Sequence, residues 1–124
     1  MATPGAFSWN SELPSGRNPF WIRDEGLAGL GLHAGDAVSV DTRVEPRDGD
    51  LVVVEVELED DALRTARRYF SLDDGERVRL EAEAVGEPIE PIELPAASVL
   101  VMGVIAARLR LSAAGASPIE EPLI

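Results

Sequence analysis

The sequence predicts an all-β domain, folded as a barrel-like sheet with an extended arm at each end. Short apolar or alternating segments follow one another along the chain and are separated by turn sequences, a pattern typical of antiparallel strands. No segment keeps the period of an amphipathic helix. The length of 124 residues is that of one domain, and 45% hydrophobic with 27% charged residues is a globular composition.

The domain is predicted to occupy residues 20–111, between an N-terminal arm at 1–19 and a C-terminal tail at 112–124. Both ends are rich in Pro, Gly and Ser and carry no sustained period. Within the arm, Trp9 and Leu13 are the apolar residues that we expect to contact the domain.

Three strands are predicted in the first half of the domain. Residues 20–23 have strand composition, and residues 37–41 alternate between apolar and polar. Between them, 26–32 hold three glycines among apolar residues, which predicts a buried turn. After the turn sequence at 46–50, the segment 51–58 is first continuously apolar and then alternating, so we expect it to begin in the core and end half exposed.

The second half begins with a poorly alternating segment at 62–70 that contains three arginines. Residues 77–82 alternate again, and 85–95 form an extended loop punctuated by prolines. The last strand, 98–111, is the longest apolar segment, and Gly103 within it predicts a bulge or a bend.

Composition excludes several kinds of chemistry. All eleven basic residues are Arg, so a Lys-based Schiff base, a P-loop and a Ser/Lys dyad are excluded. One His and no Cys exclude a multi-His zinc site, a thiol nucleophile and disulfides, and we expect no cofactor and no metal. The net charge of −12 repels nucleic acid, so no direct nucleic-acid contact is expected.

The chain is expected to be cytoplasmic and to have no membrane partner. No apolar run approaches the roughly 18 residues of a membrane span. The first residues also contain neither a basic segment nor an apolar segment of the kind found in a secretory signal.

Five groups of residues, in chain order, resemble the elements of a known family. They are Phe20-Trp21-Ile22-Arg23 with Gly26-Leu27, Gly35-Asp36-Ala37-Val38-Ser39-Val40, Arg47-Asp48-Gly49-Asp50 with the apolar run after it, Ala66-Arg67-Arg68-Tyr69-Phe70 with Val78-Arg79-Leu80-Glu81, and Val101-Met102-Gly103-Val104-Ile105. Their order resembles the C-terminal domain of LexA and its relative UmuD, the self-cleaving Ser/Lys peptidases of the LexA/signal-peptidase fold. The resemblance spans most of the chain and implies that fold.

The same resemblance implies that the reaction has been lost. It places the nucleophile of the family at Ala28 and its general-base Lys at Arg67. Alanine has no nucleophilic atom, and arginine keeps its proton at physiological pH. The turn from Gly26 to Gly35 is also shorter than in the family. We expect the surroundings of Arg67 to have gained a carboxylate such as Asp24 or Glu25.

We therefore expect a catalytically inactive LexA/UmuD-like domain that acts in protein–protein interaction or regulation, in the manner of SOS-response proteins. A homodimer is expected through the last strand, with Val99, Val101, Val104 and Ile105 as interface candidates, because a long apolar edge aggregates unless it is paired. The other interpretation of this strand is a buried central one. A protein or peptide partner is expected to add as a strand in the former cleavage cleft.

Two other functions stay open at this point. The first is a working serine hydrolase in which Ser39 or Ser71 pairs with His33 as general base. The second is a partner domain for a DNA-bound protein. The acidic turns at 60–61 and 73–76 do not have the spacing of a calcium loop, and we expect Arg64, Arg67 and Arg68 to pair with carboxylates.

Overall fold

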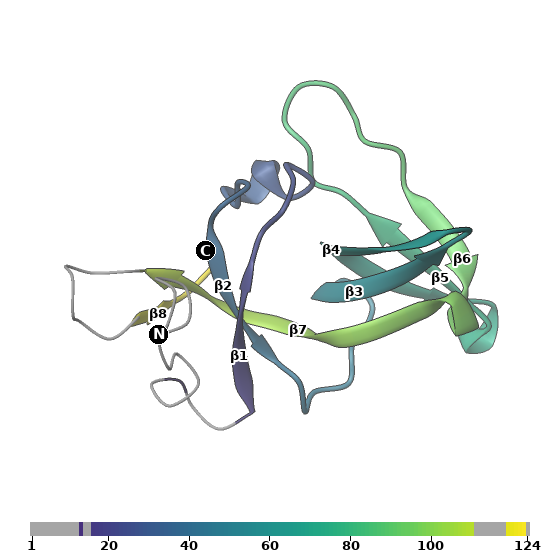
Figure 1. Ribbon diagram of the computed structural model, residues 1–124, viewed down its shortest axis with the longest axis horizontal. Helices are drawn as coiled ribbons and strands as arrows, with labels where there is room; N and C mark the ends of the chain where they lie inside the picture. The colour runs from purple at the N-terminus through teal and green to yellow at the C-terminus, as the bar shows by residue number, and fades with distance from the viewer. Residues whose placement is uncertain (1–12, 14–15, 111–118, 124) are drawn as a thin grey trace.

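A single antiparallel sheet organises the chain, in a computed structural model that describes residue 13, residues 16–110 and residues 119–123 (Figure 1). The strand order is β1-β2-β7-β3-β4-β5-β6, and β8 pairs with β7. The strands are β1 (Arg17–Trp21), β2 (Ala37–Asp41), β3 (Leu51–Leu58), β4 (Asp61–Leu72), β5 (Arg77–Glu81), β6 (Ile92–Pro95), β7 (Val99–Arg110) and β8 (Ile119–Glu121). The all-β prediction is confirmed, and no helix in the described part of the chain could span a membrane.

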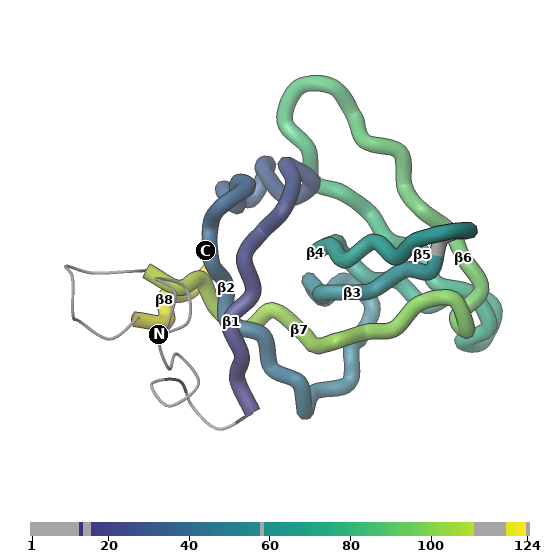
Figure 2. Tube along the Cα trace, viewed as in Figure 1, coloured from purple at the N-terminus to yellow at the C-terminus, as the bar shows by residue number. Residues whose placement is uncertain are grey.

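Strand β7 joins the two halves of the sheet, and Figure 2 shows it crossing from β1 and β2 to β3–β6. It bends where Gly103 approaches β2: a Cβ built on Gly103 would lie 2.5 Å from Cγ1 of Val40 and 2.7 Å from the carbonyl oxygen of Asp41. The pairing of β7 slips at two places, opposite Val53/Val54 and opposite Ser39/Val40. These slips confirm the predicted irregularity near Gly103. The close approach to β2 explains the glycine, because only a residue without a side chain fits there.

Strand β3 is buried on both faces, which explains its continuous apolar run. Val53 packs in a first core cluster, formed by Ile22, Leu27, Leu32, Val38, Val40, Val53, Ala66 and Ile105. Val52, Val54 and Val56 point to the other face and form a second core cluster with Val78 and Leu80. Glu57 at the far end is exposed, so the prediction that this strand begins in the core and ends at the surface is confirmed.

The prediction of an open apolar edge at 98–111 is wrong. Strand β7 pairs with β2 on one side and with β3 and β8 on the other, so it is an interior strand. Ile105 belongs to the first core cluster, and Val99, Val101 and Val104 pack against the second. Their apolar character serves the core. The edge argument for a homodimer therefore fails, and dimerisation through another surface stays a prediction.

The ends of the domain also differ from the prediction. Strand β1 begins at Arg17, inside the expected arm, and β8 lies inside the expected tail. Leu13 packs with Ala37 and Leu109 as expected, whereas Trp9 lies outside the described residues. Strand β1 overlaps the strand predicted at 20–23, whereas β8 was not predicted.

Strand β6 was likewise taken for loop, since two prolines flank it. It pairs with β5 at one edge of the sheet, a position where proline is tolerated.

Candidate functional site

Arg67 is a buried cation whose guanidinium is held by several hydrogen bonds within the protein. Its side chain is 9% exposed, and its Nη1 donates to Oδ1 of Asp24 at 3.0 Å, to Oγ1 of Thr65 at 2.9 Å and to the carbonyl oxygen of Ala66 at 2.8 Å. Thr65 in turn donates to the other carboxylate oxygen of Asp24 at 2.8 Å. The expected carboxylate partner is present, and it is Asp24.

The charge on Asp24 is stabilised by these same groups. Burial alone would raise the pKa of Asp24, but the hydrogen bonds from Arg67, the backbone N–H of Gly26 and Thr65 outweigh it and lower the pKa below its usual value. Asp24 therefore stays ionised at neutral pH, beside a guanidinium that never loses its proton.

The turn at 26–30 contacts Arg67 of β4 and the segment that follows β5. Arg67 lies against Gly26 so closely that a Cβ on Gly26 would be 2.1 Å from Nη1. The backbone of Glu83 donates to the carbonyl oxygen of Gly26 at 2.7 Å and accepts from the N–H of Gly29 at 2.6 Å. Ala28 is buried at the start of a 3₁₀ turn, Ala28–Leu30. Arg67 thus contacts the turn that carries Ala28. The contact is made at Gly26, two residues before Ala28.

Strand β4 has a half-open edge next to this turn. It pairs with β3 from Asp61 to Arg68, whereas on its other side β5 begins to pair only at Arg68. No other described strand pairs with the outer side of β4 before that point. The first residues of β4, from Asp61 to Arg64, are exposed. The outer side of β4 is therefore exposed and without a described strand partner from Asp61 to Arg64, whereas Thr65, Ala66 and Arg67 are buried.

The alternative serine–histidine constellation is not assembled. The Nδ1 of His33 is hydrogen bonded to Oε1 of Glu25 at 2.8 Å, and this bond raises the pKa of His33. Ser39 is wholly buried and donates its hydroxyl to Glu120. Ser71 lies near the end of β4, where its backbone N–H donates to Oδ1 of Asp48 at 2.8 Å. Neither serine is bonded to His33.

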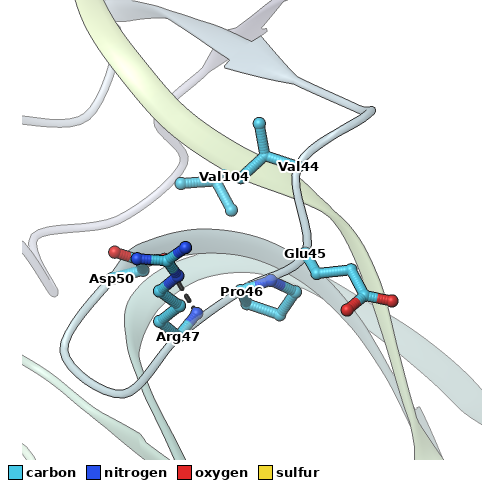
Figure 3. A pocket seen from close by; sticks show the side chains of 6 residues that line it. All are labelled: Val44, Glu45, Pro46, Arg47, Asp50 and Val104. Atoms are coloured by element: carbon cyan, nitrogen blue, oxygen red, sulfur yellow. Dashed lines mark hydrogen bonds between the residues drawn. The ribbon is translucent and has the colours of Figure 1, made fainter.

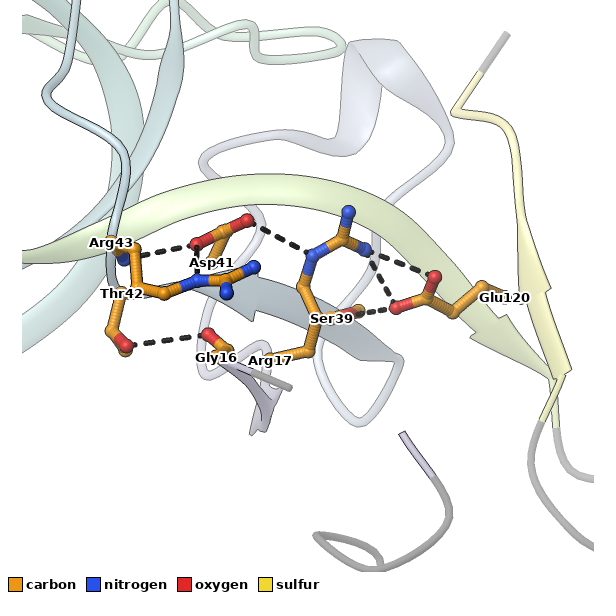
Figure 4. Close-up of polar contacts among 7 residues, drawn as sticks. All are labelled: Gly16, Arg17, Ser39, Asp41, Thr42, Arg43 and Glu120. Carbon is orange, nitrogen blue, oxygen red and sulfur yellow. Dashed lines mark hydrogen bonds and ion pairs between the residues drawn. The ribbon is translucent and has the colours of Figure 1, made fainter. Parts of the chain in front are cut away.

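A second polar network, which the sequence did not reveal, joins both ends of the chain (Figure 4). Arg17 donates from Nε to Asp41 at 3.2 Å and from Nη1 to both oxygens of Glu120, at 3.0 and 2.8 Å. Asp41 also accepts the backbone N–H of Arg43 at 2.9 Å, which is the main reason that its pKa is lowered. Glu120 lies 103 residues after Arg17, so no local pattern could link them.

The guanidinium at the centre of this network has a raised pKa. Burial would lower the pKa of Arg17, but its hydrogen bonds to Asp41 and Glu120 reverse that effect. Arg17 and Asp41 therefore both stay ionised throughout the physiological pH range.

A surface hollow of about 460 Å³ lies under the loop before β3 (Figure 3). Its lining is formed by Val44, Glu45, Pro46, Arg47, Asp50 and Val104. The backbone N–H of Arg47 donates to Oδ2 of Asp50 at 2.8 Å, which is an ordinary turn contact. Its lining contains no serine, threonine, tyrosine or histidine.

Arg64 and Arg68 pair with carboxylates, as predicted. Arg64 pairs with Glu55 at 2.9 Å and Arg68 with Glu83 at 3.0 Å, so these cations neutralise carboxylates within the fold. Among residues 13, 16–110 and 119–123, no group of three acidic or histidine side chains is placed to hold a metal ion.

No protein-family model matches this chain, and no curated protein matches it significantly. The candidate site therefore consists of the Arg67–Asp24 pair, the turn bound to it and the half-open edge of β4.

Proposed function

We propose that this chain is a catalytically inactive domain of LexA/UmuD-like fold that binds an extended segment of a partner protein. The observation that carries the proposal is the ion pair between the buried Arg67 and the partly exposed Asp24, at the position where the family resemblance calls for a neutral lysine base. The antiparallel all-β sheet and the glycine-rich turn against β4 are compatible with that fold.

The chemistry of the pair argues against hydrolysis. A general base must accept a proton near neutral pH, and a guanidinium held by a carboxylate has no lone pair with which to do so. Ala28 supplies no nucleophile on the turn, and the chain has no Lys that could replace Arg67. Asp24, Thr65 and Arg67 instead stabilise the turn against the sheet, which is a structural role.

The edge of β4 supports a binding role. An extended peptide gains affinity by adding to a sheet edge through backbone hydrogen bonds, and side-chain pockets on either face give specificity. Between Asp61 and Arg64 the outer side of β4 is such an edge. The exposed Leu63 and the Arg64–Glu55 pair offer one apolar and one polar contact beside it.

The catalytic half of the proposal is tested with substrates and with a reactive probe. We expect no turnover of peptide or ester substrates and no labelling of the chain by a fluorophosphonate. Serine-dependent turnover that is lost in Ser39→Ala or Ser71→Ala would instead establish the hydrolase alternative.

The binding half is tested with a library of extended peptides and amide NMR of the full chain. Binders are expected to shift the amide signals of residues 61–64 and to leave those of β6, the opposite edge of this half of the sheet, unchanged. A library without binders, or binders that shift only residues far from β4, would refute the proposed site.

A further inference from the structure

The geometry points to a second binding site, independent of the β4 edge. It is the place where β8 docks, and we infer that it is a receptor for an extended acidic segment of a partner protein. The chain's own residues 119–123 fill it as an internal competitor. The recognised pattern is a glutamate followed three residues later by an apolar residue, as in Glu120 and Leu123.

The backbone part of the site is the end of β7. Strand β3 pairs with β7 only as far as Val104, and β8 takes over on the same side from Arg108 to Arg110. Because β2 occupies the opposite side there, β8 fills a notch in an interior strand. Such a notch offers unpaired backbone groups to any extended segment that displaces β8.

The carboxylate part of the site is preorganised without β8. Asp41 holds the Nε of Arg17 at 3.2 Å, and this leaves Nη1 directed at the carboxylate of Glu120. Ser39 is wholly buried and adds a hydroxyl donor to the same carboxylate. A guanidinium and a hydroxyl that converge on one carboxylate form a recognition element for glutamate.

The apolar part of the site is a hollow of about 370 Å³ that remains open beside Leu123. Leu30, Leu32 and Leu51 line it, together with Gly29 and Arg68. Leu123 packs on the first core cluster yet is itself only partly buried. A partner residue at this position therefore finds apolar surface that the internal segment does not use.

The internal segment is held weakly enough to be displaced. Strand β8 pairs with β7 at three positions only, and the Arg110–Glu121 ion pair beside it is exposed, with 63% of the Arg110 side chain accessible. Exposed ion pairs contribute little to stability. The Glu120 carboxylate is thus the main attachment, and its loss increases the fraction of molecules with an open site.

The test uses the full chain and a fluorescein-labelled peptide of residues 117–124. Glu120→Gln in the protein weakens the internal competitor, so we expect the peptide to bind this variant at least about tenfold more tightly than the wild type. Glu121→Gln is the matched control, with the same change of charge on a partly exposed neighbour that pairs with Arg110, and is expected to bind like the wild type. Adding Arg17→Ala to Glu120→Gln, or changing Leu123 to Ala in the peptide, is expected to weaken binding.

A reducible disulfide between β7 and β8 gives a second test that does not depend on the folding of Glu120→Gln. Arg110 and Ile119 lie opposite each other in the pairing of β7 with β8. The natural chain has no cysteine, so Arg110→Cys with Ile119→Cys provides a single possible cross-strand disulfide. Peptide binding is expected in the reduced form and lost in the oxidised form. Equal binding by both forms, or by the wild type and Glu120→Gln, would overturn the proposal. If the wild type is a dimer and Glu120→Gln dissociates it, the occupant of the site is a second copy of this chain and not a partner protein. None of these experiments measures binding at the β4 edge, so the proposal for the β8 site and the proposal for the β4 edge can each be refuted without the other.

Discussion

The guanidinium of Arg67 and the carboxylate of Asp24 lie 3.0 Å apart, and they join the middle of β4 to the glycine-rich turn. Thr65 and the backbone of Gly26 complete the contacts of Asp24. A buried cation that loses its anion keeps its desolvation penalty, so a pair of this kind is sensitive to the removal of either partner.

Asp24→Asn is therefore expected to lower the free energy of unfolding by about 2 kcal/mol, because the buried guanidinium loses a charged acceptor. Urea denaturation of the variant and the wild type measures the difference. Glu25→Gln is the matched control, since Glu25 carries an exposed carboxylate, and we expect a change within about 0.5 kcal/mol. Equal losses in the two variants would show that the Arg67–Asp24 pair contributes nothing of its own.

The double variant Ala28→Ser with Arg67→Lys is expected not to cleave peptides. Asp24 and Thr65 would surround the new lysine, and the carboxylate would keep its amine protonated and unable to act as a base. Mass spectrometry of the incubated chain, alone and with added peptide, detects any cut. A rate well above those of the two single variants would mean that the site still assembles a working dyad.

Gly103→Ala is expected to destabilise the fold by about 1–3 kcal/mol, because the new Cβ would collide with Val40 and with the backbone of Asp41. Gly35→Ala is a useful comparison: its φ is +95° but no atom lies within 4 Å, so it tests backbone strain alone. Thermal unfolding of both variants separates collision from strain. A loss at Gly103 no larger than at Gly35 would contradict the tight approach of β7 to β2.

The pKa of His33, the only histidine, is expected to lie above its ordinary value of 6.5, because Glu25 holds its protonated form. The sign of the effect on stability follows: the contribution is complete below the unfolded-state pKa and disappears as pH rises through the higher folded-state pKa. Proton NMR of the imidazole measures this pKa directly. In Glu25→Gln it should fall, and an unchanged value would exclude the Glu25–His33 contact in solution.

Local patterns were sufficient for some elements and could not be for others. The apolar run of β3 and the glycine of β7 are properties of single strands, and both predictions are confirmed. The partner of Arg67 was anticipated among two neighbouring acids. Whether β7 is an edge depends on strands that lie far away in the sequence, and alternation is silent on that point. The Arg17–Glu120 contact was invisible for the same reason, since it exists only after the sheet has formed.

That contact ties β1 to β8. Arg17 opens β1 and Glu120 lies in β8, so the contacts of β1 are completed by a residue that is translated 103 residues later. During synthesis the carboxylate site around Arg17 and Ser39 therefore has no internal occupant until β8 has been translated. A partner that arrives during this interval meets the site without competition, which gives the order of translation a direct influence on what is bound there.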